Sequence, residues 1–164
     1  MKIIIGFSRA DSNLKLGSTA IQLAEKRNFG HAYIRYYSNE KQCDIVAQAS
    51  HGFVNEMNFD IFKETNIVVK EYTLECNEEH FKKVLKFIGS KLGTKYSQMQ
   101  IILIGIKKVL RFEVKQYNKD KYFICSEFAA VICNILDIEV PEELDYFTPS
   151  DLDTLLHNNG VTLL

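Results

Sequence analysis

Short stretches of apolar or alternating residues run along the chain, and a period of two predicts β-strands. We expect strands over residues 3–7, 31–37, 43–50 and 67–74. The polar loop 38–42 between the second and third stretches is typical of a hairpin connection. The chain therefore predicts several short strands, two of which are joined directly.

Elsewhere apolar residues recur every three or four positions, which predicts amphipathic helices. The clearest case covers residues 77–92, whose apolar face holds Phe81, Val84, Leu85, Ile88 and Leu92. Further helices are expected over residues 18–26, 98–111, 126–136 and 150–158. Ser18 and the run Thr148-Pro149-Ser150-Asp151 are typical of helix starts. This mixture predicts an α+β fold in which an antiparallel sheet packs against helices.

The hairpin fixes which side chains share a face of the sheet. A turn centred on residues 39–40 pairs Ile34 with Ile45, Ala32 with Ala47, Arg35 with Asp44, and His31 with Gln48. One face is then apolar, and the other carries an ion pair and an amide beside an imidazole. An amide in that position can fix the tautomer of the ring. A bulge that moves the register by one residue would separate His31 from Gln48.

Length and composition restrict the class of protein. The 164 residues are 46% hydrophobic, enough for a single domain over 1–164 with a core that needs no disulfide or metal. The net charge of -1 argues against a polybasic nucleic-acid binder. The opening apolar run is too short for a signal peptide, and residues 101–106 are too short to cross a bilayer. We expect a soluble cytoplasmic protein with no transmembrane segment and no nucleic-acid partner.

The four cysteines stand singly, with no C-x-x-C pair, which favours reduced thiols over a zinc site. Cys125 lies at the start of the helix predicted over 126–136, where the macrodipole favours a thiolate. Free backbone N–H groups at that helix start, including its own, can stabilise an oxyanion. The same cysteine also fits the apolar stripe of the helix as a buried core residue. The residues alone leave both interpretations open.

Five segments resemble, in order, the landmarks of the circularly permuted NlpC-type papain-like proteins, the YiiX-like group. They are Gly30-His31-Ala32-Tyr33-Ile34, Ile45-Val46-Ala47-Gln48-Ala49, Gly93-Thr94-Lys95-Tyr96-Ser97, Phe123-Ile124-Cys125-Ser126-Glu127-Phe128 and Thr148-Pro149-Ser150-Asp151-Leu152. The resemblance covers nearly the whole chain. It implies a permuted papain-like fold in which the histidine strand precedes the cysteine helix.

The resemblance assigns the nucleophile to Cys125, the base to His31 and the orienting residue to Gln48. Many relatives have a carboxylate or a histidine where Gln48 stands. Glutamine can orient the ring but cannot stabilise the imidazolium by charge. His51 is the reserve candidate for the orienting role. A thiolate–imidazolium pair would give a bell-shaped pH profile whose alkaline limb reports the imidazolium.

The resemblance implies a cysteine peptidase or amidase that hydrolyses an amide, isopeptide or ester bond without a metal or organic cofactor. Peptides, peptidoglycan fragments and acyl lipids are the implied substrates. Tyr96, at the family's spacing from Gly93, and Ser126, next to the nucleophile, are assigned to substrate binding. The alternatives are a non-catalytic papain-like binding or assembly module that holds a ligand in the same cleft, and a lipid-acyl hydrolase or transferase.

Basic residues concentrate in one part of the chain, at Lys82, Lys83, Lys86, Lys91, Lys95, Lys107, Lys108 and Arg111. Acidic residues nearby favour a solvated helix face. The alternative is a surface for an anionic partner such as a lipid headgroup, a cell-wall polymer or a nucleic acid.

Overall fold

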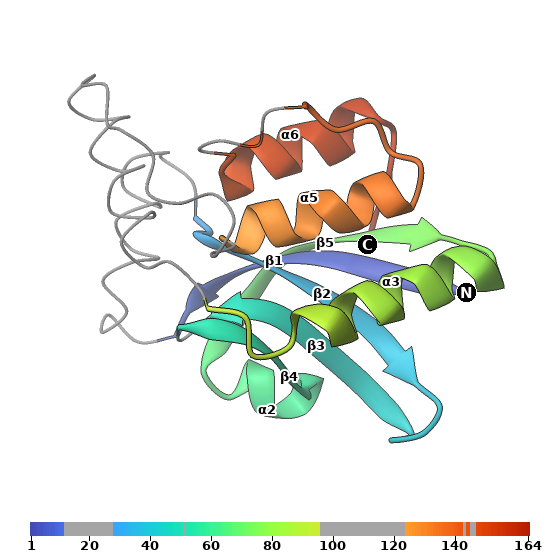
Figure 1. The fold of residues 1–164 in the computed structure, drawn as a ribbon. Coiled ribbons are helices and arrows are strands. Elements are labelled where there is room, and N and C mark those ends of the chain that lie inside the picture. The colour runs from blue at the N-terminus through green and yellow to red at the C-terminus, as the bar shows by residue number, and fades with distance from the viewer. Residues whose placement is uncertain (12–27, 51, 96–123, 143, 145–146) are drawn as a thin grey trace.

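The computed structural model describes residues 1–11, 28–50, 52–95, 124–142, 144 and 147–164, and these form one antiparallel sheet and four helices (Figure 1). The strands are β1 (Lys2–Ala10), β2 (His31–Ser38), β3 (Cys43–Ser50), β4 (Phe53–Asn58), β5 (Asn66–Glu75) and β6 (Thr162–Leu163), in the spatial order β4-β3-β2-β1-β5-β6. The helices are α2 (Phe59–Lys63), α3 (Glu78–Lys91), α5 (Cys125–Ile135) and α6 (Pro149–Asn158). The predicted α+β class is confirmed. Among the described residues no helix has the length and apolar character needed to cross a membrane.

The structure confirms most predicted elements with small changes at their ends. Strands β1, β2, β3 and β5 and helices α3, α5 and α6 stand where the patterns predict them. The predicted helices over 18–26 and 98–111 lie outside the described residues. Strand β4, helix α2 and the two-residue strand β6 were not predicted. Their segments are short, and pairing with β3 and β5 rather than local pattern defines the two strands.

Helices α3, α5 and α6 cover one face of the sheet, and α2 covers the other (Figure 1). Successive side chains of a strand point to opposite faces. Ala32 and Ile34 of β2 therefore enter the large core beneath α5, whereas Tyr33 enters a small core with Val46 and Phe62 of α2. By the same alternation His31, the first residue of β2, belongs to the Tyr33 face.

The predicted register of the β2–β3 hairpin is wrong by two residues. Ile34 lies opposite Ala47 rather than Ile45, and Ser38 lies opposite Cys43. The connecting loop has four residues, 39–42, and is closed by a hydrogen bond from the Lys41 N–H to the Ser38 hydroxyl. The turn is centred between residues 40 and 41 rather than 39 and 40. Gln42, the last residue of the loop, takes a left-handed conformation at φ 52°. A register shift of two residues leaves each side chain on the predicted face of the sheet, because side chains alternate between the faces with a period of two.

A partly buried ionic cluster ties β2 to β3 and β5 on the α2 face. Arg35 donates to both oxygens of Glu71, at 3.0 and 2.7 Å, and to Asp44 at 2.8 Å, which confirms the predicted pair with Asp44. The Tyr33 hydroxyl also donates to Glu71, at 2.7 Å. Burial and the Glu71 charge raise the pKa of Tyr33, so this phenol stays protonated. The Arg35 guanidinium lies 4.5 Å from the centre of the Phe59 ring.

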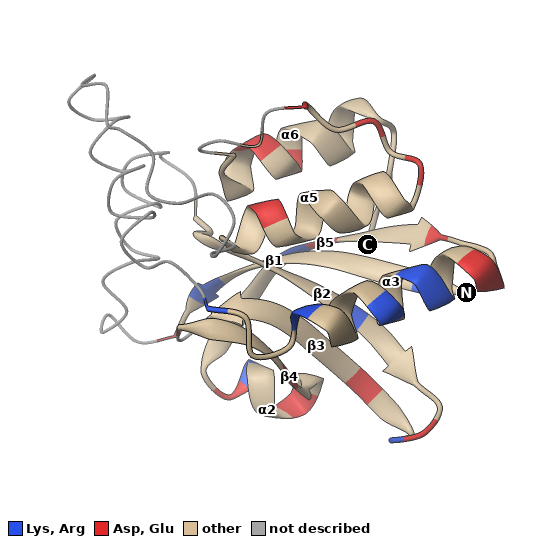
Figure 2. Ribbon diagram, viewed as in Figure 1, with Lys and Arg blue, Asp and Glu red and all other residues tan. Residues whose placement is uncertain are grey.

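The lysines of α3 support the solvated-face interpretation. Lys82 pairs with Glu78 at 2.5 Å and Lys83 with Glu79 at 2.7 Å, each one helical turn apart. Figure 2 shows both signs of charge along this helix. Exposed pairs of this kind contribute little stability and do not by themselves make a binding surface.

Gly6 of β1 lies directly opposite Tyr33, and a Cβ atom there would stand 2.1 Å from the tyrosine ring. We expect Gly6→Ala to lower the free energy of unfolding by about 1–3 kcal/mol, because the fully buried ring would have to move. Gly89→Ala is the matched control, since a Cβ on this exposed residue of α3 meets nothing within 4 Å. It should raise stability by up to about 1 kcal/mol. Urea unfolding checks both values, and an unchanged midpoint for Gly6→Ala would contradict the packing described here.

Candidate functional site

The first residue of α5 and the start of β2 meet at one end of the sheet (Figure 1). Cys125 opens α5 with only 2% of its surface exposed. The backbone N–H groups of Ala32, Ser126 and Cys125 itself all face its sulfur. Because Ala32 follows His31 in the chain, the fold brings the candidate nucleophile to the strand that carries the candidate base.

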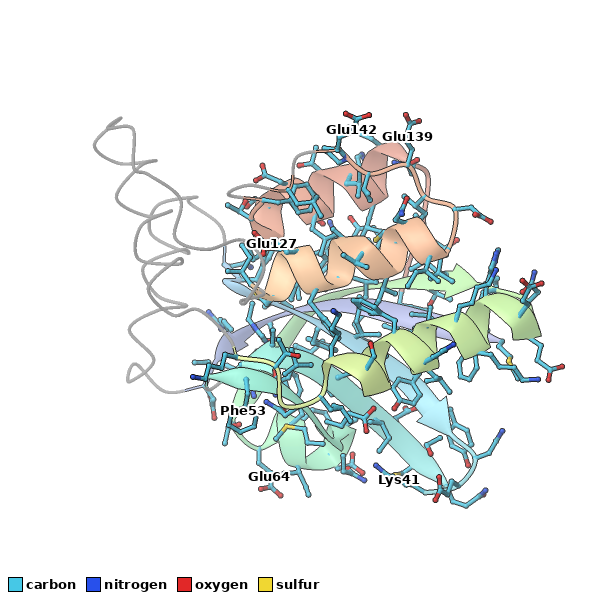
Figure 3. All side chains as sticks on the ribbon, in the orientation of Figure 1. Lys41, Phe53, Glu64, Glu127, Glu139 and Glu142 are labelled. Atoms are coloured by element: carbon cyan, nitrogen blue, oxygen red, sulfur yellow. The ribbon has the colours of Figure 1, made fainter. Side chains whose placement is uncertain are left out.

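Local sequence explains why α5 begins at Cys125. Ile124 has an extended backbone, and its N–H donates to a Glu127 carboxylate oxygen at 3.2 Å. Figure 3 labels Glu127 at this end of the helix. The carboxylate holds the helix start and suits the positive end of the macrodipole. Phe128 and Ala129 then bury the helix against the sheet.

His31 and Gln48 are hydrogen-bonded side chains. The imidazole Nε2 lies 2.7 Å from the amide oxygen Oε1 of Gln48. An amide oxygen only accepts, so in the neutral ring the proton is on Nε2 and Nδ1 is the basic nitrogen. The predicted contact is confirmed although the register is different: the two residues are diagonal rather than direct neighbours, and they share a face. Gln48 is 3% exposed, so water competes little for this bond.

Asn55 of β4 also belongs to this group of polar side chains. It lies directly opposite Gln48, whose Nε2 donates to the Asn55 Oδ1 at 3.4 Å and to the Met57 sulfur at 3.5 Å. The hydrophobic pattern of the chain does not predict β4, and Asn55 is therefore not among the predicted site residues. The alternation of Val54 and Glu56 around it, after a glycine, was the available signal.

Burial dominates the ionisation of Cys125. It raises the pKa of the thiol to about 11, although the three backbone N–H groups act in the opposite direction. The Glu127 charge adds to the rise. The prediction that the helix start favours a thiolate is therefore wrong for the resting protein, because the loss of hydration outweighs the helix dipole. At neutral pH the sulfur carries its proton.

The remaining predicted residues fall into two groups. Ser126 is fully buried and its hydroxyl donates to the Phe147 carbonyl, so this side chain joins α5 to the segment before α6. Tyr96 and His51 lie outside the described residues. The four cysteines are free thiols, and burial raises the pKa of Cys133 to about 12.

No model of a known protein family matches the chain, and no curated protein matches it. In the part of the chain that the structure describes, no three His, Cys, Asp or Glu side chains gather where they would hold a metal ion. What these residues offer chemically is a protonated thiol with backbone N–H groups around its sulfur, and an imidazole, on the residue before Ala32, that is hydrogen-bonded to an amide.

The raised pKa of Cys125 predicts how its reactivity depends on pH. We expect the rate of alkylation by iodoacetamide to rise about tenfold per pH unit from pH 7 to pH 9, because the thiolate fraction is still far from saturation. Peptide mass spectrometry measures the rate at each cysteine. Cys133, on the same helix and also buried, serves as the control and should react more slowly. A plateau for Cys125 within this range would show that the thiolate forms near neutral pH.

Proposed function

We propose that this protein is a thiol-dependent hydrolase with Cys125 as nucleophile, His31 as base and Gln48 as the residue that orients the base. The hydrogen bond of 2.7 Å between His31 and Gln48 carries the proposal. It fixes the ring on the strand whose next residue, Ala32, turns its N–H toward the Cys125 sulfur. The three residue types needed for nucleophilic catalysis by a cysteine thus belong to adjoining elements.

The order of these elements supports a permuted papain-like fold. The strand with His31 comes first, the strand with Gln48 follows it and pairs with it, and the helix with Cys125 comes later and packs on both. A cysteine at the start of a helix that lies on an antiparallel sheet is the arrangement that the motif resemblance implies. We therefore propose the permuted NlpC-type architecture for this α+β chain.

The raised pKa of Cys125 favours general-base attack over a preformed ion pair. The His31 Nδ1 takes the thiol proton while the sulfur bonds to the substrate carbonyl carbon, and the carbonyl π electrons move to its oxygen. The N–H groups of Cys125 and Ser126, which face the sulfur at rest, donate to that oxyanion in the proposed step. The imidazolium then protonates the leaving amine or alcohol as its bond to carbon breaks.

Water completes the reaction. It attacks the thioester while the His31 Nδ1 accepts one of its protons, the bond between carbon and sulfur breaks, and the sulfur regains a proton from the imidazolium. Gln48 holds the ring in the same tautomer through both steps. The proposed substrates are amide or isopeptide bonds of peptides and peptidoglycan fragments, with the ester bonds of acyl lipids as a further possibility for the same chemistry.

A second function, a non-catalytic binding or assembly module, is favoured by one observation. Cys125 is 2% exposed and firmly protonated at rest, which is also how a structural core cysteine behaves. In that case the fold binds a ligand that it does not cleave. Turnover separates the two functions directly.

Peptidoglycan fragments, isopeptide-linked peptides and acyl lipids form the substrate panel for this test. For a hydrolase we expect wild type to release product and Cys125→Ala to lose at least about a thousandfold in kcat, because the nucleophile is gone. Cys133→Ala, which removes the other buried thiol of α5, is the control for packing effects and should retain activity. Equal binding by wild type and Cys125→Ala with no product from either would identify the binding module instead.

Gln48→Glu tests the orienting role through the pH profile. A carboxylate beside the ring favours the imidazolium and should raise the pKa of His31 by about one unit. With a neutral thiol and a neutral imidazole at rest, activity requires deprotonated His31, so the acidic limb of kcat/KM should move to higher pH. In a resting ion pair, the alkaline limb would move instead.

Gln42→Glu provides the same change of charge in the exposed 39–42 loop and should leave the profile in place. A folded Gln48→Glu protein in which neither limb moves would remove Gln48 from the orienting role.

A further inference from the structure

We infer that Asn55 is a positioning residue that selects the tautomer of His31, acting through the Gln48 amide. The importance of this tautomer for catalysis rests on the proposed function. The selection itself is a property of the resting protein and can be measured without a substrate.

The side chains of His31, Gln48 and Asn55 form a continuous line of hydrogen bonds across strands β2, β3 and β4. The Asn55 Nδ2 donates to two backbone carbonyls of its own hairpin, that of Ser50 at 3.2 Å and that of Phe53 at 3.4 Å. The Gln48 Nε2 donates to the Asn55 Oδ1 at 3.4 Å, and the His31 Nε2 donates to the Gln48 Oε1 at 2.7 Å. The line thus runs from the backbone between β3 and β4 to the imidazole on β2.

The two backbone carbonyls, those of Ser50 and Phe53, determine which group donates and which accepts in each hydrogen bond of this line. Backbone carbonyls only accept, so the group of Asn55 that faces them must be its NH2, and its Oδ1 must face Gln48. The amide group of Gln48 that meets this oxygen must then be its NH2, which turns Oε1 toward His31. An oxygen there requires a proton on Nε2 and leaves Nδ1 as the basic nitrogen. A reversed Gln48 amide would favour the opposite tautomer.

Burial and backbone geometry make this selection effective. Gln48 is 3% exposed, so an unpaired amide group would not be satisfied by bulk water. Among the residues that the structure describes, the Met57 sulfur is the other acceptor of the Gln48 NH2, and a thioether accepts hydrogen bonds only weakly. Gly52, at φ 92°, forms part of the turn that brings the Ser50 and Phe53 carbonyls around Asn55.

The chemical consequence concerns which ring nitrogen is available as a base. With the proton on Nε2, the Nδ1 atom can accept a proton from a thiol or a water molecule. With the amide reversed, the proton would move to Nδ1 and the ring could no longer act as a base through that atom. Asn55 therefore affects the reaction without contacting the reacting atoms.

Nitrogen-15 NMR of the full chain, with long-range proton–nitrogen correlations, reports the protonated ring nitrogen directly. The His31 signals are those that His31→Ala removes. In wild type we expect the Nε2–H tautomer to dominate. Asn55→Ala should lower the ratio of Nε2–H to Nδ1–H by roughly 2- to 12-fold, the change expected when one hydrogen bond of ordinary strength no longer favours one amide orientation.

Asn58→Ala is the matched control on the same strand. Its Oδ1 caps α2 by accepting from the Asp60 N–H at 2.7 Å, so this variant loses a structural hydrogen bond outside the line. It should leave the His31 tautomer ratio at the wild-type value. Asn55→Asp keeps an acceptor oxygen for the Gln48 NH2 and should retain the Nε2–H tautomer.

Two results would overturn the inference: a folded Asn55→Ala protein with the wild-type ratio, or an Asn55→Asp protein that loses the Nε2–H tautomer. If Asn55→Ala does not fold, the Asp variant alone decides. These outcomes are independent of the substrate panel. Absence of turnover would reject the hydrolase but leave the tautomer shift measurable, whereas turnover with an unshifted tautomer would reject only the role of Asn55.

Discussion

The alternation of side chains along β2 is the constraint on which the rest of the molecule depends. This strand lies inside the sheet between β1 and β3, and side chains from both of its faces enter a core. Ala32 and Ile34 supply the apolar surface on which α5 packs, and that packing brings Cys125 to the strand. The intervening positions place Tyr33 and Arg35 over α2, with His31 at the strand start bonded to Gln48. One strand thereby organises the core, the ionic cluster and the candidate site.

Burial stabilises the packing around the site and also disfavours ionisation of its thiol. The thiol of Cys125 is buried, and the loss of hydration raises its pKa so that it stays protonated at neutral pH. Gln48 supplies no negative charge with which to stabilise an imidazolium. In the proposed mechanism both features favour a neutral pair over an ion pair, and such a pair requires that the base accept the proton at the correct nitrogen. The orientation of one buried amide thus becomes more important here than in a site with a carboxylate.

The sequence predicts contacts that depend on periodicity and misses those that depend on packing. The contacts of His31 with Gln48 and of Arg35 with Asp44 survive a register error of two residues, because the period of a strand is two. The start of α5 at Cys125 follows from local pattern. Asn55 was missed because β4 is defined by its pairing with β3. The raised pKa of Cys125 was missed because it depends on how fully α5 is buried.

The central claim is that Cys125 and His31 act as one unit, and cross-linking tests it most directly. A short bifunctional alkylating reagent such as 1,3-dibromoacetone joins a cysteine sulfur to a histidine nitrogen only when the two are within reach of its three-carbon bridge. Mass spectrometry of the digested protein should show the peptides of Cys125 and His31 joined by one bridge, and His31→Ala should abolish that product. Modification of Cys125 through a single arm, with no bridge to His31 in the folded wild-type protein, would contradict the account.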